Sequence, residues 1–211
     1  MQVTGNNIDK RFKEVSIQLS LGGHSFSEAG ANLRPAPRGD AVPPAPALGQ
    51  HPAVALDTHR VALIPEALFR AEDAEACLRT DGLAPAEGER TVLCAPVGGI
   101  AAVAAFDGAA LDAVRRAAPL ARFVSPLQLL AADTAPSAVQ ISVQGPRVYL
   151  TVRGEALRYA HVLPFDGDAD LVYYLTRLGE LFPIKDYTIY IYAEAPTCKT
   201  LSRYWRNVKR V

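Results

Sequence analysis

Few residues in this chain have both the type and the spacing that catalysis or metal binding requires. Asp166, Asp168 and Asp170 resemble the start of a calcium-binding loop, in which alternate carboxylates coordinate the ion. The glycine and the closing glutamate of such a loop are missing from the residues that follow. The three aspartates precede an apolar segment with helical spacing, so they favour capping of that helix, whose N-terminus attracts negative charge.

The histidines and cysteines do not share a metal-binding spacing. They are His24, His51, His59 and His161, with Cys77, Cys94 and Cys198. Three widely separated thiols match neither a zinc motif nor a disulfide framework, and they indicate a reducing compartment. Cys94 and Cys198 have no adjacent base in the sequence and are interpreted as buried thiols. We therefore expect no bound metal.

Each half of the chain opens with a strand, a glycine turn and a return strand. The turn is Gly22-Gly23 in the first half and Gly145-Pro146 in the second. Apolar and polar residues alternate on both sides of each turn, which is typical of strands with one buried face. Neither turn continues into the Lys-Ser/Thr pair of a phosphate loop. From local sequence alone, both are structural hairpins.

Further elements follow each hairpin. After the second hairpin, the pattern predicts strands over residues 157–165 and 188–192 and an edge strand over 207–211. It also predicts two helices, one with Leu171, Leu175 and Leu178 on its inward face and one over 197–205.

After the first hairpin, the pattern predicts a strand over 60–64 and a second hairpin over 91–106. It also predicts a helix over 66–78 with Leu68 on its buried side and a helix over 108–118 that Asp107 caps.

Changes in composition divide the chain into regions. Residues 1–13 are polar and predicted to be loose, and residues 14–133 and 138–211 are predicted to form two subdomains. Residues 31–52 combine many prolines with alanine, glycine and arginine. Because this stretch offers little apolar surface to bury, it is predicted to be a loop within the first subdomain, either mobile or extended as a polyproline-like strap.

The overall charge argues against an anionic partner. The 211 residues carry 22 Lys and Arg and 22 Asp and Glu, so no global field attracts nucleic acid or an anionic membrane. Cations do cluster near the C-terminus, at Lys199, Arg203, Arg206, Lys209 and Arg210. A solvated helix end explains this cluster most simply. No apolar run is long enough for a membrane span or a signal peptide, so a cytoplasmic protein is expected.

Aromatic residues are concentrated in the second half, which holds all eight tyrosines and the only tryptophan. Rings with a polar tip suit an interface between proteins. The candidate partner surface consists of Tyr173, Tyr190, Tyr192, Tyr204 and Trp205. The alternative is that helices and Lys/Arg side chains of the same chain cover these rings.

The two hairpin-led halves resemble the duplicated actin-like ATPase fold. More closely, the segments EVSIQLSLGGHSFSEAG, RVALIPEALF and HVLPFDGDADLVYYL are similar to a family of uncharacterised bacterial proteins, a domain of unknown function assigned the actin-like fold. That fold also occurs in pilus-assembly and cell-division proteins. The resemblance implies an α/β, ribonuclease-H-like architecture with two subdomains and mixed sheets.

The resemblance also implies where nucleotide would bind, and this sequence departs from the pattern there. Active members carry an aspartate and glycines in each opening hairpin, for metal and phosphate. The corresponding positions here are Ser20, Gly22 and Gly23 in the first hairpin and Ser142, Gln144 and Gly145 in the second. Serine replaces both aspartates, and Pro146 removes a backbone donor. The glycine pair expected to bind adenosine is replaced by residues 192–195.

These departures favour a catalytically inactive, actin-like binding or scaffold protein without a cofactor. Its expected partner is another protein, and a second copy of the same chain is an open alternative. A divergent enzyme that binds a nucleotide or another phosphorylated ligand between the subdomains is the main rival. A nucleic-acid accessory protein that uses the basic C-terminal helix is the third hypothesis. Fold alone does not decide among them.

Overall fold

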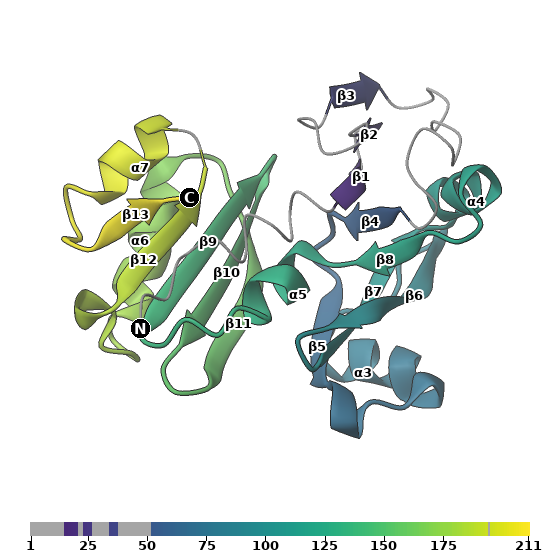
Figure 1. The fold of residues 1–211 in the computed structure, drawn as a ribbon, viewed down its shortest axis with the longest axis horizontal. Helices are drawn as coiled ribbons and strands as arrows, with labels where there is room; N and C mark the ends of the chain where they lie inside the picture. The colour runs from purple at the N-terminus through teal and green to yellow at the C-terminus, as the bar shows by residue number, and fades with distance from the viewer. Residues whose placement is uncertain (1–14, 21–22, 27–33, 38–51, 194) are drawn as a thin grey trace. The chain divides into compact units, whose positions relative to one another are not determined.

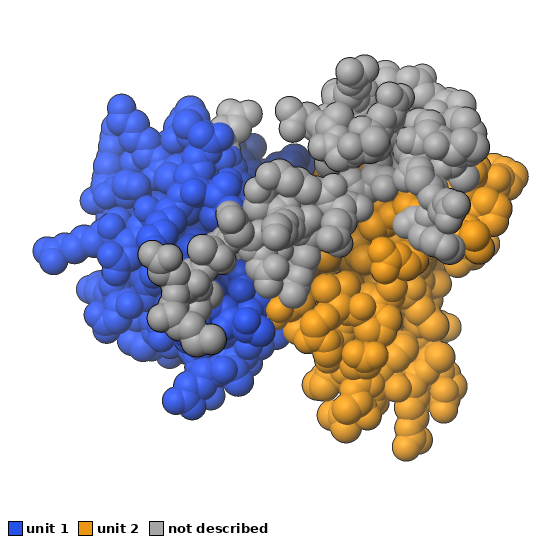
Figure 2. Space-filling view, viewed as in Figure 1, with its two compact units in different colours: residues 1–8, 133–211 blue, residues 9–132 orange. Residues whose placement is uncertain are grey.

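The structure is a computed structural model that describes residues 15–20, 23–26, 34–37, 52–193 and 195–211. Contacts divide the chain into two compact units, coloured in Figure 2. Unit 1 contains residues 133–211, and unit 2 contains the described residues up to 132. The expected loose N-terminus, Gly22 and most of the proline-rich stretch lie outside the described residues.

Unit 1 is built on a five-stranded sheet with the order β11-β10-β9-β12-β13 (Figure 1). The first three strands in the sequence pair antiparallel: β9 (Ala138–Gln144), β10 (Arg147–Arg153) and β11 (Leu157–Pro164). The last two, β12 (Thr188–Tyr192) and β13 (Val208–Arg210), extend the sheet in parallel. Gly145 in the β9–β10 turn has φ +54°, as the first position of a type II′ turn requires. The predicted strands of this half are confirmed.

Helices cover one face of the unit 1 sheet. They are α6 (Asp168–Leu178) and α7 (Ala195–Leu201), with the short 3-10 helix η3 (Ile184–Asp186). Leu171, Leu175 and Leu178 are buried against the sheet residues of one core cluster, which confirms the predicted phase of α6. The last helix ends at Leu201 rather than at Trp205, because Arg203 and Tyr204 make the tighter backbone bonds of a turn.

Unit 2 contains a sheet with the corresponding order, β3-β2-β1-β4-β8. Its strands are β1 (Val15–Ser20), β2 (Gly23–Phe26), β3 (Arg34–Pro37), β4 (Ala53–Leu56) and β8 (Arg122–Val124). The first three are antiparallel, and β4 and β8 are parallel to β1, as in unit 1. Within the proline-rich stretch 31–52, the described residues 34–37 form strand β3 and are therefore extended rather than a free loop. Its two prolines are tolerated because β3 is the edge strand, where a backbone donor is not needed.

A three-stranded antiparallel sheet lies between β4 and β8 in the sequence. It consists of β5 (Val61–Pro65), β6 (Glu89–Val97) and β7 (Ile100–Asp107), with β7 in the centre. Residues 101–106 of β7 are all buried, and four of them are alanine, so both faces pack closely. Helix α4 (Gly108–Ala117) follows, and Asp107 caps it as predicted by accepting a hydrogen bond from the Ala110 N–H at 2.7 Å.

The predicted helix over 66–78 is wrong in its first half. The chain forms two 3-10 turns, η1 (Glu66–Leu68) and η2 (Ala71–Asp73), before helix α3 (Ala74–Thr80) begins. Phe69 and Arg70 are extended between the two turns, and Phe69 packs against the core cluster that contains Val103. Leu68, expected on the buried side, is 74% exposed. Packing of the Phe69 ring against this core therefore stabilises the chain more than an uninterrupted helix over 66–78 would.

The last helix of unit 2, α5 (Pro126–Ala131), is buried along its whole length. Ser125 caps it, and its Oγ accepts a hydrogen bond from the Leu127 N–H at 3.2 Å. The side chain of Gln128 has no contact with solvent and bonds backbone groups on other elements. Its Nε2 donates to the carbonyl oxygens of Ala95, at 2.9 Å, and Ile100, at 2.8 Å. Gln128 thus ties α5 to the β6–β7 hairpin.

Candidate functional site

The hairpin of unit 1 carries the predicted positions Ser142, Gln144 and Gly145. Ser142 is buried on β9, in register with Tyr149 of β10 and Tyr192 of β12. The Nε2 of Gln144 donates to the Ser142 Oγ at 3.1 Å. The carbonyl of Pro146 accepts a bond from the Phe165 N–H at 2.9 Å, and proline has no N–H to offer a ligand. This hairpin presents hydroxyl and amide groups, and no carboxylate.

The corresponding end of unit 2 contains a carboxylate that the sequence analysis missed. Ser20 and Gly23 face each other across the β1–β2 turn, and Leu19 of β1 pairs in parallel with Leu56 of β4. This register brings Ser20 and Asp57, which follow those leucines, to the same end of the sheet. Asp57 is only 3% exposed, and Thr58 beside it is also buried.

Asp57 belongs to a row of polar residues at the carboxyl ends of the parallel strands of unit 2. Ser20 ends β1, Asp57 and Thr58 follow β4, and Ser125 follows β8. Ligands of open α/β sheets bind at such ends. A carboxylate and hydroxyls can hold a hydrated cation or hydrogen-bond a phosphate. Among the described residues, no three His, Cys, Asp or Glu side chains are close enough together to bind a metal on their own.

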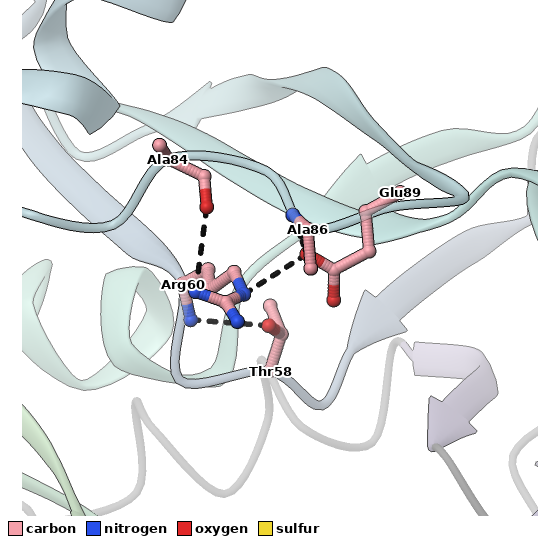
Figure 3. A network of polar contacts seen from close by, with 5 residues as sticks. All are labelled: Thr58, Arg60, Ala84, Ala86 and Glu89. Atoms are coloured by element: carbon pink, nitrogen blue, oxygen red, sulfur yellow. Dashed lines mark hydrogen bonds and ion pairs between the residues drawn. The ribbon is translucent and has the colours of Figure 1, made fainter.

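A partly buried ion pair fixes the backbone next to Asp57 (Figure 3). The Arg60 Nε lies 2.9 Å from the Glu89 Oε2, which also accepts a bond from the Ala86 N–H at 2.8 Å. The Arg60 N–H donates to the Thr58 Oγ1 at 3.1 Å, and its guanidinium reaches the Ala84 carbonyl at 3.3 Å. Because the guanidinium and the Thr58 hydroxyl have these partners, the network serves to position the segment after β4.

The five predicted partner-surface aromatics differ in exposure. Tyr173 on α6 is 60% exposed and Tyr204 after α7 is 64% exposed. Trp205 packs against the unit 1 core, and its ring lies 5.7 Å from that of Tyr204. Tyr190 and Tyr192 are half-buried on the sheet face opposite Ile189 and Ile191, and Lys209 lies over the Tyr190 ring at 5.8 Å. The structure therefore brings Tyr204 and Trp205 together and places Tyr190 and Tyr192 on the other face of the sheet.

An apolar groove between β11 and α6 is a second feature that the sequence analysis missed. It has a volume of about 350 Å³, and its walls include Tyr159, Tyr173, Tyr174 and Leu181. The Tyr174 hydroxyl donates to the Pro164 carbonyl at 2.9 Å. Burial raises the pKa of the Tyr159 phenol, and burial followed by the nearby Asp170 and Tyr173 raises the pKa of Tyr174. Both phenols therefore stay neutral well above physiological pH.

The two sheets with corresponding strand orders define the class of fold: the chain has the actin-like ATPase fold, as predicted. The chain is similar to a protein of actin-like ATPase fold and unknown function from Bacteroides thetaiotaomicron. The TM-score is 0.69 at 15% identity, over 96% of this chain and 92% of that one. It is also similar to a chain of a PilM-PilN type IV pilus biogenesis complex, with a TM-score of 0.53 at 15% identity, over 94% and 88%. No protein-family model and no curated protein matches the sequence.

Within the described ranges, no helix is both long enough and apolar enough to cross a membrane.

Proposed function

We propose that this actin-like protein acts in the cytoplasm by binding another protein and does not hydrolyse nucleotide. The observation that carries the proposal is the chemistry of the unit 1 hairpin. Ser142 stands at the aspartate position, its hydroxyl is bonded by Gln144, and Pro146 has no N–H. A serine hydroxyl is neutral at pH 7 and cannot replace a carboxylate in holding magnesium.

The comparison with the pilus complex supports a protein partner. The similar chain in that structure is part of a PilM-PilN assembly, so the same fold there works in contact with another protein. The exposed rings of Tyr173 and Tyr204 give unit 1 of this chain apolar surface of the kind that protein interfaces use.

Magnesium-dependent ATP turnover by the purified protein is expected to stay at the background rate of a protein-free control, because the unit 1 hairpin has Ser142 and no carboxylate to position the metal. A coupled phosphate-release assay measures this, with Ser142→Arg as the matched variant. Turnover in the wild type that disappears in Ser142→Arg would contradict the proposal.

Capture of a protein partner from the native cell is the expected positive result. Tagged wild type should enrich a specific protein, and the double variant Tyr173→Ser, Tyr204→Ser should enrich it at least tenfold less, since both rings are exposed and their removal spares the core. Tyr190→Ser is the comparison on the opposite sheet face. Equal enrichment by wild type and the double variant would remove these rings from the interface.

A second candidate function is the binding of a phosphorylated ligand at the carboxyl ends of β1, β4 and β8. The buried Asp57 carboxylate favours it, because it adds an acidic group to the strand ends at which ligands of open α/β sheets bind. Calorimetric titration with magnesium and ATP separates the two functions. Binding without turnover that is lost in Asp57→Asn would support this candidate, and absence of heat would support the protein-binding proposal alone.

A further inference from the structure

Among the described residues, strand β11 has a paired strand on one side only. It is an outer strand of the unit 1 sheet and pairs with β10 on its inner side. The Phe165 N–H points toward β10, because it donates to the Pro146 carbonyl. Successive residues of a strand direct their backbone groups to alternate sides, so Leu163 and His161 also face β10. Pro164, Val162 and Ala160 then face outward.

The bond from Tyr174 supports this assignment independently. Its hydroxyl reaches the Pro164 carbonyl at 2.9 Å from α6, which requires that carbonyl to point away from β10. The open edge of the described sheet therefore consists of the N–H and C=O groups of Ala160 and Val162, and it ends at Pro164. Only an extended backbone satisfies donors and acceptors with this two-residue spacing.

The apolar groove lies directly beside this edge. Tyr159 and Leu163 of β11 form one wall, and Tyr173, Leu178 and Leu181 form the other. Leu181 is 73% exposed and adds apolar surface at the open side of the groove. A strand added to β11 would place every second side chain on the helix-covered face, and therefore into this groove.

The charges of β11 indicate what the added strand carries. Arg158 and His161 are exposed, residues 157–164 contain no Asp or Glu, and the two charged residues that line the groove, Arg177 and Glu180, form an ion pair with each other at 2.8 Å. Pairing of β11 with β11 of a second copy, Ala160 opposite Val162, would set the two His161 side chains opposite each other and give neither Arg158 an acidic partner. A segment with acidic residues has the complementary charge.

We propose that β11 and the groove between β11 and α6 bind an extended segment of a partner protein as an additional β-strand. The segment has apolar side chains at alternate positions, which enter the groove, and acidic residues at the intervening positions, which lie beside Arg158 on the other face of the sheet. This inference rests on the proposed protein-binding function and specifies how the partner is held.

The probe for the experiment is a library of random dodecapeptides displayed on phage and selected on the full chain. Selected peptides should alternate apolar residues and contain Asp or Glu. Their affinity should fall at least tenfold in Val162→Pro, because proline removes the outward N–H while leaving the bonds to β10 in place. Val162→Ala keeps that N–H and should change affinity less than threefold.

Amide exchange measured by NMR on the wild type provides a readout that needs no variant. The amides of Ala160 and Val162 should exchange rapidly in the free protein and become protected when a selected peptide is added. The amides of His161 and Leu163 should be protected in both states, because they already bond β10.

The outcomes separate this inference from the function on which it rests. Peptides that bind equally to wild type and Val162→Pro, unchanged exchange at Ala160 and Val162, or a selection without enriched peptides would each overturn the strand-addition site. A native partner captured equally by wild type and Val162→Pro would also overturn it while supporting the protein-binding function. Self-association that is lost in Val162→Pro would replace the foreign segment by a second copy.

Discussion

Leu175→Ala will lower the free energy of unfolding of unit 1 by about 2–5 kcal/mol. Leu175 lies on the inward face of α6 and is completely buried in the cluster that contains Ile141 and Leu150. Truncation to alanine removes apolar contacts and leaves a cavity that neighbouring strands cannot fill without moving. Urea unfolding measures the loss through the fluorescence of Trp205, which is the only tryptophan and packs against the same cluster.

The matched control lies two residues away on the same helix. Tyr173 is 60% exposed, so Tyr173→Ala should cost less than about 1 kcal/mol in the same assay. If Leu175→Ala costs no more than Tyr173→Ala, the inward face of α6 is assigned incorrectly.

Gln128→Met will destabilise unit 2 by roughly 2–4 kcal/mol, although methionine has a similar length and is more apolar. Three bonds are lost: Nε2 to the carbonyls of Ala95 and Ile100, and the bond at 3.3 Å that Oε1 accepts from the Ser125 N–H. The backbone groups left behind are buried, and unpaired buried groups retain the full cost of their desolvation.

The stability of unit 2 can be measured through the rate at which the Cys94 thiol is labelled. Fluorescence is not suitable, because unit 2 has no tryptophan or tyrosine. Burial raises the pKa of the Cys94 thiol to about 12, so the thiolate needed for disulfide exchange forms only when the unit opens. Labelling of Cys94 should accelerate in Gln128→Met by the factor that corresponds to the lost stability. Gln144→Met makes the same exchange in unit 1 and should leave Cys94 labelling unchanged. Equal rates in wild type and Gln128→Met would show that the three bonds are dispensable.

The parts of the fold that sequence predicted are those with local, periodic signals. The β9–β10 hairpin follows from alternation around Gly145, and the phase of α6 follows from leucines at helical spacing. The predicted helix over 66–78 is interrupted because Phe69 turns toward a core formed by residues distant in sequence. Propensity cannot anticipate such tertiary packing.

The candidate sites were harder to predict than the fold because they depend on pairing between distant segments. Asp57 becomes a site residue only when β4 lies in parallel beside β1. The groove depends on α6 lying next to β11, and the open edge depends on β11 being the last strand of the sheet. The prediction that Ser20 and Ser142 stand where active members carry aspartates rests, in contrast, on sequence alone, because each residue lies at a fixed offset from a glycine turn.

The shared strand order of the two units bears on how the gene arose. Between the fourth and fifth strands, unit 1 has only α7, whereas unit 2 has the three-stranded sheet with α3 and α4. The two halves correspond to what duplication of one five-stranded unit, with a single insertion at this connection, would produce. The inserted module leaves and rejoins the sheet without changing the neighbours of any original strand. The connection between β4 and β8 therefore accommodates a whole additional sheet while the order of the five strands stays the same as in unit 1.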